Sequence, residues 1–544
     1  MQHMISAPGH PAWTAFLIFL QRAALARQNG QTEAGSIWLD AAALLQVLDD
    51  AALQHVTQAL LEQHRHDDAI ALAAIIAQLR TDDAVASFRL GYTLQMANRH
   101  RDALAPYRRA LALNPELPQL RNNLAGALAI IRENISEQVS LLESALLANP
   151  LDSDAWTNLT QASRFAMNLP RALQAGERAV QLAPGSPLAL NNYALALKEA
   201  QRWEEAERFT QHACERAPGD PSMRSNLAML QLTRGNYEHG WAAHEARWQG
   251  SSELGGARPA FPAPQWQGES LAGKTLLVWG EQGMGDLLQC CRFIPLLARR
   301  VHAQGGRLVW NSFPQMGALL ERSLAQYADM YSAGGGVECL PRFDYEIPLL
   351  SVPLVLGTVG NTLPETVPYL HPDPAASAVW RARFASERRL KVGLAWTGSL
   401  DHQRNPFRRV GWERYAAALA GIQGAAFYSL QPGAAADLAA VREAGLTMID
   451  HTGDLQTFDD TAAFVSALDL VVTVCTSVAH LAGAIGQRTW VLLDANPHWT
   501  WLLERRDSPW YPSATLYRQR EFGDWGPVME EVTRDLKTLI NQRT

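Results

Sequence analysis

The sequence predicts an all-α superhelix of paired helices in the first half of the chain and an α/β part with two sheet-containing lobes in the second half. Three observations predict this architecture. Prolines recur every 34 or 35 residues from Pro115 to Pro218. After residue 250, two segments run from an apolar strand through a Gly-rich turn into a helix, at Leu276 to Arg292 and at Val392 to Trp412. With 544 residues, the chain is also too long for one hydrophobic core.

Bulk composition excludes several classes of protein. The net charge of −7 argues against a protein that coats nucleic acid or an anionic membrane. The five cysteines contain no Cys-x-x-Cys pair, so neither a disulfide framework nor a zinc site is predicted. The apolar patch from Trp13 to Leu20 is shorter than the ~20 residues that a membrane span needs. We therefore expect a soluble, cytoplasmic protein with no bound metal, no membrane span and no nucleic-acid partner.

The first half carries helical repeats. Its prolines are 35, 34 and 34 residues apart, and each follows a helix with an Ala-rich face; they are Pro115, Pro150, Pro184 and Pro218. A small residue recurs in the second helix of several units, where two helices must approach closely; these residues are Ala103, Ala172 and Ala206. The pattern resembles tetratricopeptide repeats over roughly residues 50 to 248, after an irregular capping region.

The expected domains follow from these patterns. They are an N-terminal helical cap (1–49), the tetratricopeptide repeats (50–250), a Pro- and Gly-rich linker (251–270) and two lobes (271–385 and 386–544). Stacked repeats form a superhelix with a groove, so the array predicts a docking surface for a protein partner. A dimerisation or spacer element is the alternative, and the protein is a possible homo-oligomer.

Asparagines recur on the first helix of successive repeats. They are Asn123, Asn158, Asn192 and Asn226. Because Asn is a poor helix former, its repeated placement suggests a ladder of amides that hydrogen-bonds an extended peptide of an acceptor protein. A structural hydrogen bond between neighbouring repeats is the alternative.

The first lobe begins with a strand and a Gly-rich turn. Lys274 to Trp279 is predicted to be a buried strand, Gly280 to Asp286 the turn, and Leu287 to Arg299 an apolar helix. The spacing of the glycines is not the dinucleotide fingerprint, and the next strand ends in Asn311 and Ser312 without an acidic ribose-binding residue. A nicotinamide or flavin enzyme is therefore disfavoured.

The second lobe repeats this arrangement. Lys391 to Gly398 is another strand that enters a Gly turn, and strands and helices alternate from there to Leu493. Two such blocks imply two facing Rossmann-like lobes with a cleft between them.

Several motifs in these lobes occur together in one known group of enzymes. The motifs are Gly280 to Asp286, Ser429 to Gln431, Asp460 to Ala462, Thr476 to Ala484 and Ser508 to Pro512. They resemble the second class of glycosyltransferase folds, GT-B, and most closely the ADP-heptose:lipopolysaccharide heptosyltransferase-like group fused to tetratricopeptide repeats. The match covers about residues 240 to 540. Flagellin-modifying transferases of some bacteria share the layout. The resemblance implies metal-independent, inverting sugar transfer with a nucleotide-sugar as donor and no cofactor.

Asp152 and Asp154 form an Asp-x-Asp pattern, which is the metal-binding signature of a different class of sugar transferases. Here the pair lies between Pro150 and Trp156, where acidic residues favour the start of a helix. We therefore assign it to helix capping.

Sugar transfer without a metal needs helix N-terminal amides and cationic side chains around the departing diphosphate. The residues expected to bind the nucleotide-sugar are Gly283, Gly285, Trp396, Arg404, Arg408, Gln431, Thr476, Ser477, Val478 and Ala479. Thr476 and Ser477 open a helix after a strand, and the arginines supply charge. The resemblance suggests that Gln431 contacts the base or ribose. The alternatives are solvated loop arginines and a turn glutamine.

Two residues are assigned to catalysis. His480 lies one helical turn after Thr476 and is expected to donate a hydrogen bond to a phosphate or sugar oxygen, the alternative being a core histidine. Resemblance to heptosyltransferases, whose matching aspartate is the base, assigns Asp286 as the general base. A helix cap is the alternative for Asp286, and Glu281 is a second candidate base. Similar sequences carry an acid where this chain has Cys475, which leaves donor choice and the strength of activity open.

The function expected from the sequence is a glycosyltransferase that modifies a protein docked on the repeats, such as flagellin or another surface protein. One alternative is a transferase acting on a lipid or polysaccharide precursor. Another is a non-catalytic scaffold that senses nucleotide-sugars. A fragment lacking residues 1 to 248 is expected to be soluble and to hydrolyse the donor slowly, but to fail to glycosylate its protein acceptor.

Overall fold

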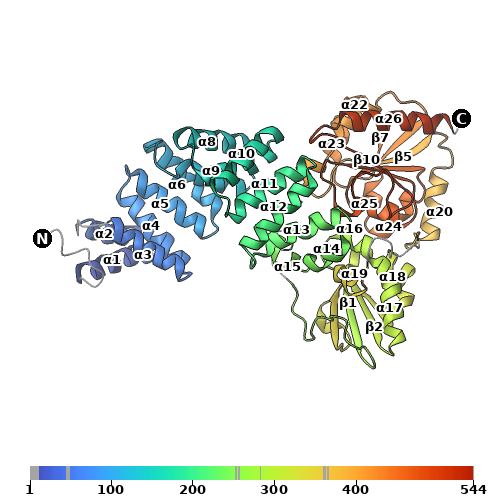
Figure 1. Ribbon diagram of the computed structural model, residues 1–544, viewed down its shortest axis with the longest axis horizontal. Helices are drawn as coiled ribbons and strands as arrows, with labels where there is room; N and C mark the ends of the chain where they lie inside the picture. The colour runs from blue at the N-terminus through green and yellow to red at the C-terminus, as the bar shows by residue number, and fades with distance from the viewer. Residues whose placement is uncertain are drawn as a thin grey trace. The chain divides into compact units, whose positions relative to one another are not determined.

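A computed structural model describes residues 11–44, 50–251, 254, 258–281, 283–358, 363 and 367–542 (Figure 1). The chain divides into two compact units, Met1–Ala196 and Leu197–Thr544. Parts of the expected cap (1–10 and 45–49) and linker (252, 253 and 255–257), and Gln282 of the first Gly-rich turn, lie outside the described residues.

The first unit is built from helices, and from α3 to α10 each described helix packs against the next one in the chain. They are α1 (Pro11–Gln28), α2 (Thr32–Leu44), α3 (Asp50–Glu62), α4 (His66–Leu79), α5 (Ala84–Met96), α6 (His100–Leu113), α7 (Leu120–Ile130), α8 (Ile135–Ala148), α9 (Ser153–Phe165), α10 (Leu169–Leu182) and α11 (Pro187–Glu199), whose last residues belong to the second unit. These pairs of helices have the tetratricopeptide layout that the proline period predicts.

One backbone feature marks every helix pair. A residue with positive φ lies in the turn between the two helices of each pair, at intervals of 34 or 35 residues: Gly30, His64, Asn98, Arg132, Met167, Gln201 and Gly235. The first of these lies between α1 and α2. The segment predicted to be an irregular cap therefore has the same layout as the repeats that follow it, a regularity that the prolines do not reveal because they begin at Pro115.

Small residues let the paired helices approach closely. The predicted positions Ala103, Ala172 and Ala206 are fully buried. A methyl group on Gly91 of α5 would lie 2.5 Å from the ring of Tyr107 on α6. Because real side-chain carbons do not approach that closely, Tyr107 packs directly on the backbone of α5.

Aspartates cap the first helices of several repeats. Asp152 accepts hydrogen bonds from the N–H groups of Asp154 and Ala155, each at 3.0 Å, and so caps α9. The assignment of the Asp-x-Asp pair to capping is confirmed. Among the described residues, no group of three or more His, Cys, Asp or Glu side chains is placed to hold a metal ion.

The second unit begins with the last repeat helices. They are α12 (Trp203–Arg216), α13 (Pro221–Thr233), α14 (Tyr237–His244) and α15 (Arg247–Gly250). Leu232, Tyr237 and Trp241 belong to the hydrophobic core that also contains the first sheet. The rings of Trp241 and Trp499 meet edge to face, with centroids 5.2 Å apart. The predicted boundary near residue 250 is therefore not a boundary in packing, because the aromatic side chains before it are part of this core.

The first sheet is parallel with strand order β3-β2-β1-β4. Its strands are β1 (Thr275–Trp279), β2 (Arg307–Ser312), β3 (Met330–Ala333) and β4 (Tyr345–Pro348), and its helices are α16 (Met284–Cys290), α17 (Ile294–Ala303), α18 (Gly317–Leu324) and α19 (Val352–Val355). The single helix expected from Leu287 to Arg299 is two helices. The first begins three residues earlier, and the second begins at Ile294, with Pro295, which lacks an N–H, in its first turn.

The second sheet is also parallel, with strand order β10-β9-β8-β5-β6-β7. Its strands are β5 (Leu390–Ala395), β6 (Ala425–Ser429), β7 (Met448–Ile449), β8 (Leu470–Val474), β9 (Thr489–Leu493) and β10 (Ala514–Arg518). The helices are α20 (Pro374–Arg383), α21 (Asn405–Arg408), α22 (Trp412–Leu419), α23 (Ala435–Glu443), α24 (Phe458–Val465), α25 (Ser477–Ala484) and α26 (Gly526–Asn541). From β5 the chain adds β6 and β7 on one side. It then returns to place β8 on the other side of β5 and adds β9 and β10 beyond it.

Helix α20 packs on the second sheet domain. Trp380 of α20 lies against Phe464 of α24, with ring centroids 4.7 Å apart, and Phe384 lies 4.9 Å from Tyr428 of β6. The predicted division between residues 385 and 386 separates this helix from its packing partners.

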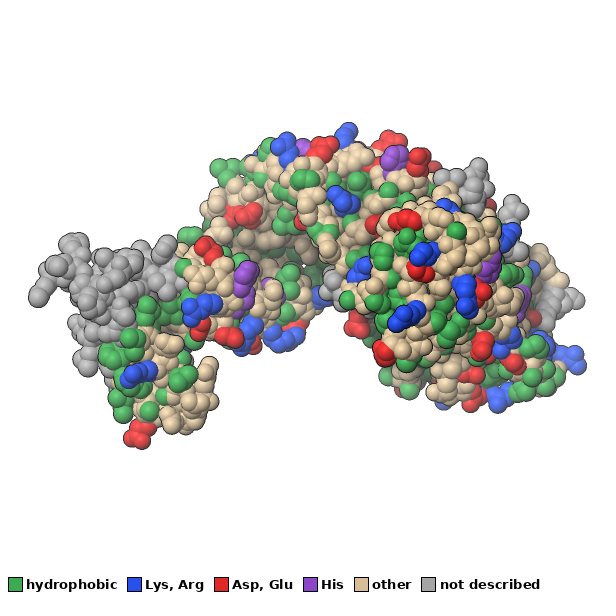
Figure 2. All heavy atoms as spheres, turned by 90° about the horizontal axis from the view of Figure 1, so that it is seen from below, with side chains coloured by type: hydrophobic (Ala, Val, Ile, Leu, Met, Phe, Trp, Pro, Cys, Tyr) green, Lys and Arg blue, Asp and Glu red, His purple; other side chains and the backbone are tan. Residues whose placement is uncertain are grey.

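No helix among the described residues is long and apolar enough to cross a membrane. On the face shown in Figure 2, acidic and basic side chains are interspersed and do not gather into one basic patch.

Candidate functional site

Apart from Gly283 and Gly285, which follow β1 of the first sheet, the predicted donor-binding residues lie at or just after loops that follow the carboxyl ends of strands in the second sheet. The point between β5 and β8, where the strand order reverses, is the usual ligand site of such sheets. Trp396 directly follows β5, and Cys475 and Thr476 directly follow β8. Gln431 follows β6, and its Oε1 accepts a hydrogen bond of 3.3 Å from the N–H of Thr397. The structure therefore brings these segments together at one edge of the sheet.

Trp396 lies beneath this edge. Its side chain is 1% exposed, and its Nε1 donates to Asp437 of α23 at 2.8 Å. The indole is thus part of the core of the second sheet and anchors the loop after β5, so its side chain does not face the ligand region as a nucleotide-binding residue would.

The two predicted arginines lie in different environments. Arg404 is held by the carboxylates of Glu199 and Asp494, at 2.7 and 2.5 Å. Arg408 lies against the loop after β5, where a methyl group on Gly398 would lie 2.5 Å from its Nη2. Within the described residues the buried Nε of Arg408 has no hydrogen-bond partner. Of the two, Arg404 is taken up by carboxylates, whereas Arg408 has, in the described part of the chain, a side-chain donor without a partner beside the loop after β5.

The turn after β8 opens helix α25. Thr476 has an extended backbone at the N-cap position, and Ser477 is the first helical residue. The N–H groups of a first helical turn have no acceptor within the helix and favour an anion. Ala479 is buried and Val478 packs against the apolar cluster beside α24. These two residues can therefore contribute mainly through their backbone.

His480 is a buried, neutral histidine. Its ring is 4% exposed, and its Nδ1 is 3.0 Å from the hydroxyl of Tyr511. Burial, and then the positive charge of Arg408, lower the pKa of His480 to about 3. At neutral pH the imidazole carries no charge, so any contact it makes with a substrate oxygen is a neutral hydrogen bond.

Asp286 lies in the first turn of α16, after the Gly-rich turn of the first sheet. Gly283 has a φ of 111°, a conformation that favours glycine, and a methyl group there would lie 2.3 Å from Oδ2 of Asp286. The carboxylate is partly buried and lies back over the turn. Glu281, the second candidate base, is 3% exposed and paired with Arg247 at 2.7 Å, so it is not available to a substrate.

The two turns meet. A methyl group on Gly285 would lie 2.9 Å from Cδ2 of His480 and 3.7 Å from Cα of Ser477. Helices α16 and α25, one from each sheet domain, therefore approach each other at their first turns. The predicted residues Asp286, Gly285, Ser477 and His480 gather at this contact.

Cys475 lies at the base of the second turn. The indole N–H of Trp501 donates to its Sγ at 3.1 Å. Burial raises the pKa of the thiol, and the negative charges of Asp494 and Asp286 act in the same direction. The thiol therefore stays protonated at neutral pH, which disfavours a role as nucleophile.

The four predicted asparagines make different contacts. Asn158 donates to Oδ1 of Asn122 at 2.8 Å, and Asn192 donates to the carbonyl of Thr157 at 3.3 Å. Both hydrogen bonds join one repeat to the preceding one, as the structural alternative proposes. Asn123 is hydrogen-bonded to Tyr107, and Asn226 also has an interaction partner. Acceptor binding by these amides stays a prediction.

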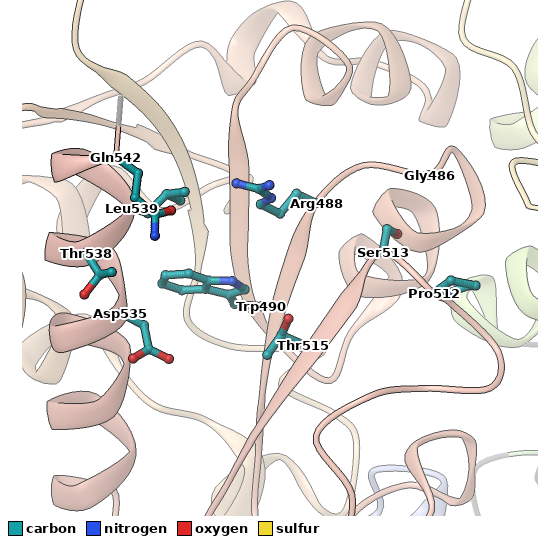
Figure 3. A pocket seen from close by; sticks show the side chains of 10 residues that line it. All are labelled: Gly486, Arg488, Trp490, Pro512, Ser513, Thr515, Asp535, Thr538, Leu539 and Gln542. Atoms are coloured by element: carbon teal, nitrogen blue, oxygen red, sulfur yellow. The ribbon is translucent and has the colours of Figure 1, made fainter. Parts of the chain in front are cut away.

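An open pocket lies elsewhere on the second sheet domain (Figure 3). Arg488 and Ser513, which line it, precede β9 and β10, and Asp535 and Leu539 line it from α26. It therefore lies at the amino ends of the strands, on the opposite edge from the predicted residues.

Sequence reasoning missed several polar residues at the site. Thr500 donates to Oε1 of Gln289 at 2.9 Å and lies 2.8 Å from Nδ1 of His498, which links α16 to the segment after β9. Tyr511 is hydrogen-bonded to His480 and belongs to the Ser508 to Pro512 motif, to which the sequence assigns no role. No local sequence pattern marks Thr500, Gln289 or His498, because the residues that they contact are distant in sequence.

No protein-family model matches the chain. It is similar to Protein FlbA of Caulobacter vibrioides, with 29% identity over 480 residues that cover 82% of this chain and 77% of that protein. Among solved structures, pilF of Pseudomonas aeruginosa is 18% identical, with a TM-score of 0.32, over 38% of this chain and 95% of its own. YrrB, described as a TPR protein with an unusual peptide-binding site, is 19% identical with a TM-score of 0.27, over 33% of this chain and 93% of its own.

Proposed function

We propose that this chain is a GT-B glycosyltransferase that moves a sugar from a nucleotide-sugar to a protein acceptor held by the repeats. The observation that carries the proposal is the contact between the turn of Asp286 and the turn of Ser477. Each turn follows a strand beside the point where the strand order of its sheet reverses. Folds of this kind bind nucleotides at that point. Two such sites that face each other suit a reaction between a nucleotide-bound donor and a second substrate.

The second sheet domain is proposed to bind the donor. The first-turn amides of α25 and the guanidinium of Arg408 are suited to the negative charge that builds on the leaving phosphate. Gln431 is proposed to contact the base or ribose from the end of β6. Since the site supplies charge from the chain itself, transfer is proposed to need no metal.

The first sheet domain is proposed to present the acceptor to the base. Asp286 takes the proton of the acceptor hydroxyl, the oxygen attacks the anomeric carbon from the face opposite the phosphate, and the phosphate leaves with the bonding electrons. Inversion follows from this single displacement. Neutral His480 is proposed to hydrogen-bond a substrate oxygen beside Gly285. Flagellin or another surface protein is the proposed acceptor, and the cytoplasm the proposed location.

The test of catalysis is a panel of nucleotide-sugars, with donor hydrolysis and transfer measured for the wild type and for Asp286→Asn. Loss of a general base should slow the reaction by ~10²–10⁴ with donor affinity within a few-fold. Asp344→Asn, at the amino end of β1, is the matched control and should keep full activity. Wild-type turnover in Asp286→Asn would move the base elsewhere. Donor binding without turnover in the wild type would favour the sensing scaffold.

The phosphate assignment has its own test. Arg408→Ala should weaken binding of the nucleoside diphosphate product by calorimetry and leave binding of the bare nucleoside unchanged. Its exposed neighbour Arg409 provides the control variant Arg409→Ala. Equal losses for nucleoside and diphosphate would refute the assignment. Added chelator should leave the rate unchanged. If the protein modifies a lipid precursor but no protein acceptor, the lipid or polysaccharide alternative is favoured.

A further inference from the structure

The loop after the first strand of each sheet is held by an ion pair, in which both side chains are buried for the first loop and the Glu199 side chain is buried for the second. In both cases the partner belongs to the helical segment that begins the second unit, from the end of α11 to α15. The first loop follows β1, where the described residues are Gly280, Glu281 and 283–286, and it carries the proposed base. The second loop follows β5, from Trp396 to Arg409, and it carries the proposed phosphate-binding arginine.

Arg247 of α15 holds the first loop. Its Nε and Nη2 donate to the two carboxylate oxygens of Glu281 at 2.7 and 2.9 Å, and Glu281 also accepts the N–H of Leu350 at 2.9 Å. The remaining hydrogens of the guanidinium reach the carbonyl of His244 and the side chains of Glu245 and Ser351. The side chains of Arg247 and Glu281 are 4% and 1% exposed. This arginine has an acceptor for every donor it carries.

Glu199, at the end of α11, holds the second loop. Its carboxylate accepts from Nη1 of Arg404 at 2.7 Å, and its side chain is fully buried. Arg404 also donates to Asp494 at 2.5 Å and to the carbonyl of Asn496 at 3.0 Å. Burial acts to lower the pKa of Arg404, but the charges of Glu199 and Asp494 outweigh it, so the pKa is raised and the guanidinium stays charged.

The two pairs have opposite polarity. The helical segment supplies the cation to the first loop and the anion to the second. Glu281 lies five residues before Asp286, and Arg404 lies four residues before Arg408. A buried charge without its partner is strongly unfavourable, so each loop has one low-energy position relative to the helices.

We propose that the terminal repeats position both substrate loops, with Arg247 acting through Glu281 on Asp286 and Glu199 acting through Arg404 on Arg408. The roles of Asp286 and Arg408 rest on the proposed function, whereas the positioning of the loops rests on the contacts alone. The repeats then contribute to donor chemistry as well as to acceptor docking. Arg404, predicted from the sequence to bind the diphosphate, is in this view a positioning residue.

Hydrogen exchange on the full-length protein tests the positioning directly. Glu199→Gln should speed exchange in peptides covering 396–409 by at least about tenfold and leave those covering 283–290 unchanged, and Glu281→Gln should do the reverse. Both variants should fold, because Asp494 still neutralises Arg404 and Glu245 still neutralises Arg247. Tyr237→Phe is the control, since it removes a hydrogen bond to Trp510 from the same segment without touching either loop.

Kinetics separate positioning from general stability. With a nucleotide-sugar that the wild type hydrolyses, Glu281→Gln should lower kcat with KM nearly unchanged, because the base is misplaced. Glu199→Gln should raise KM and weaken binding of the nucleoside diphosphate, because Arg408 is misplaced. Arg247→Lys and Arg404→Lys, which keep the charge, should retain more function than the corresponding methionine variants.

The outcomes are distinct. Loosening of both loops by either substitution, or of neither, overturns the proposal. Should a glutamine variant not fold, Arg247→Met and Arg404→Met are measured in the same exchange experiment, and an unaltered loop in both would also overturn it. A wild type that neither binds nor hydrolyses any nucleotide-sugar defeats the proposed function, and the exchange results still decide the positioning.

Discussion

The repeats of the first unit and the repeat helices of the second share one sequence period, yet different chemistry holds them in place. In the first unit, ion pairs such as Arg99 with Asp102 have side chains about half exposed, and such pairs contribute only ~0–1 kcal/mol. In the second unit the helices carry Trp241, Arg247 and Glu199, all buried among residues of the sheets or their loops. The repeat period therefore predicts where the helices are. Side chains outside the repeat pattern decide whether a repeat packs only on other repeats or also on the sheet domains.

Truncation should have the largest effect, because it tests whether the second unit folds without its repeat helices. A fragment starting at residue 249 should fail to fold, because it loses Leu232, Tyr237 and Trp241 from a shared core. Removing one large core side chain costs ~3–5 kcal/mol, against a total stability of ~5–15 kcal/mol. A fragment starting at Pro187, which keeps α11 to α15, should fold.

Circular dichroism and calorimetry on the two fragments decide the matter. A cooperative melt for the fragment starting at residue 249 would show that α12 to α15 are dispensable, as the sequence alone suggested. The same result would remove the structural basis for loop positioning by Arg247 and Glu199.

A second way is acidification. Burial lowers the pKa of His480 to about 3 from 6.5, and it also lowers the pKa values of His244 and His498. A depressed pKa means that the unfolded chain binds the proton more tightly than the folded protein does. The stability that comes from burying these histidines in neutral form is therefore present above pH 6.5 and is lost as the pH falls toward 3. All three histidines lie in the second unit.

The melting temperature of the Pro187 fragment should therefore fall between pH 7 and pH 5. His480→Asn should reduce the size of that fall. A melting temperature that stays constant over this range would contradict the burial of the neutral histidines.

A third test concerns the close contacts of the first unit. Gly91→Ala should destabilise it by ~1–3 kcal/mol, because the new methyl group meets the ring of Tyr107. Gly126→Ala, on α7, is the control: its nearest neighbour would be 3.7 Å away, so higher helix propensity should make it neutral or stabilising. Urea titration measures both, and equal effects would mean that the contact between Gly91 and Tyr107 is looser than described.

The smallest expected effect concerns the residues with positive φ. Met167 has a φ of 58° in the turn where Gly30 and Gly235 serve the same purpose in other repeats. An unbranched side chain in this conformation costs roughly 1–2 kcal/mol, so Met167→Gly should stabilise the first unit by up to about 1 kcal/mol. Glycine at Gln161, inside α9, should instead destabilise. No gain at Met167 would mean that its side chain makes compensating contacts.

Much of the fold could be predicted because its signals are local. Proline spacing, small residues on helices and Gly-rich turns after strands each depend on a few neighbouring residues. The parallel sheets follow from alternation of strands and helices, and loops at their carboxyl ends carry the candidate residues Asp286, Arg408 and Thr476.

The other features depend on contacts between residues that are far apart in the sequence. Arg404 pairs with Glu199, which lies 205 residues earlier, and the buried Trp396 donates a hydrogen bond to Asp437 of α23. A sequence pattern gives the type of these side chains but not their neighbours. The Ser508 to Pro512 motif was the one available signal, since a Trp-Tyr pair between prolines indicates a packed segment. It did not show that Tyr511 would hold His480.

The recurrence of one left-handed residue per helix pair also has a consequence for how the array can change in length. Among the described helices of the first unit, the extensive contacts join neighbouring pairs, so a whole pair can be gained or lost between two such turns and the pairs on either side can still pack on each other. The pairs around Gln201 and Gly235 do not have this freedom, because Glu199 and Trp241 are tied to the sheet domains. Natural variation in repeat number should therefore fall before α11, which would let such proteins change the reach of the array while the two loops keep their spacing.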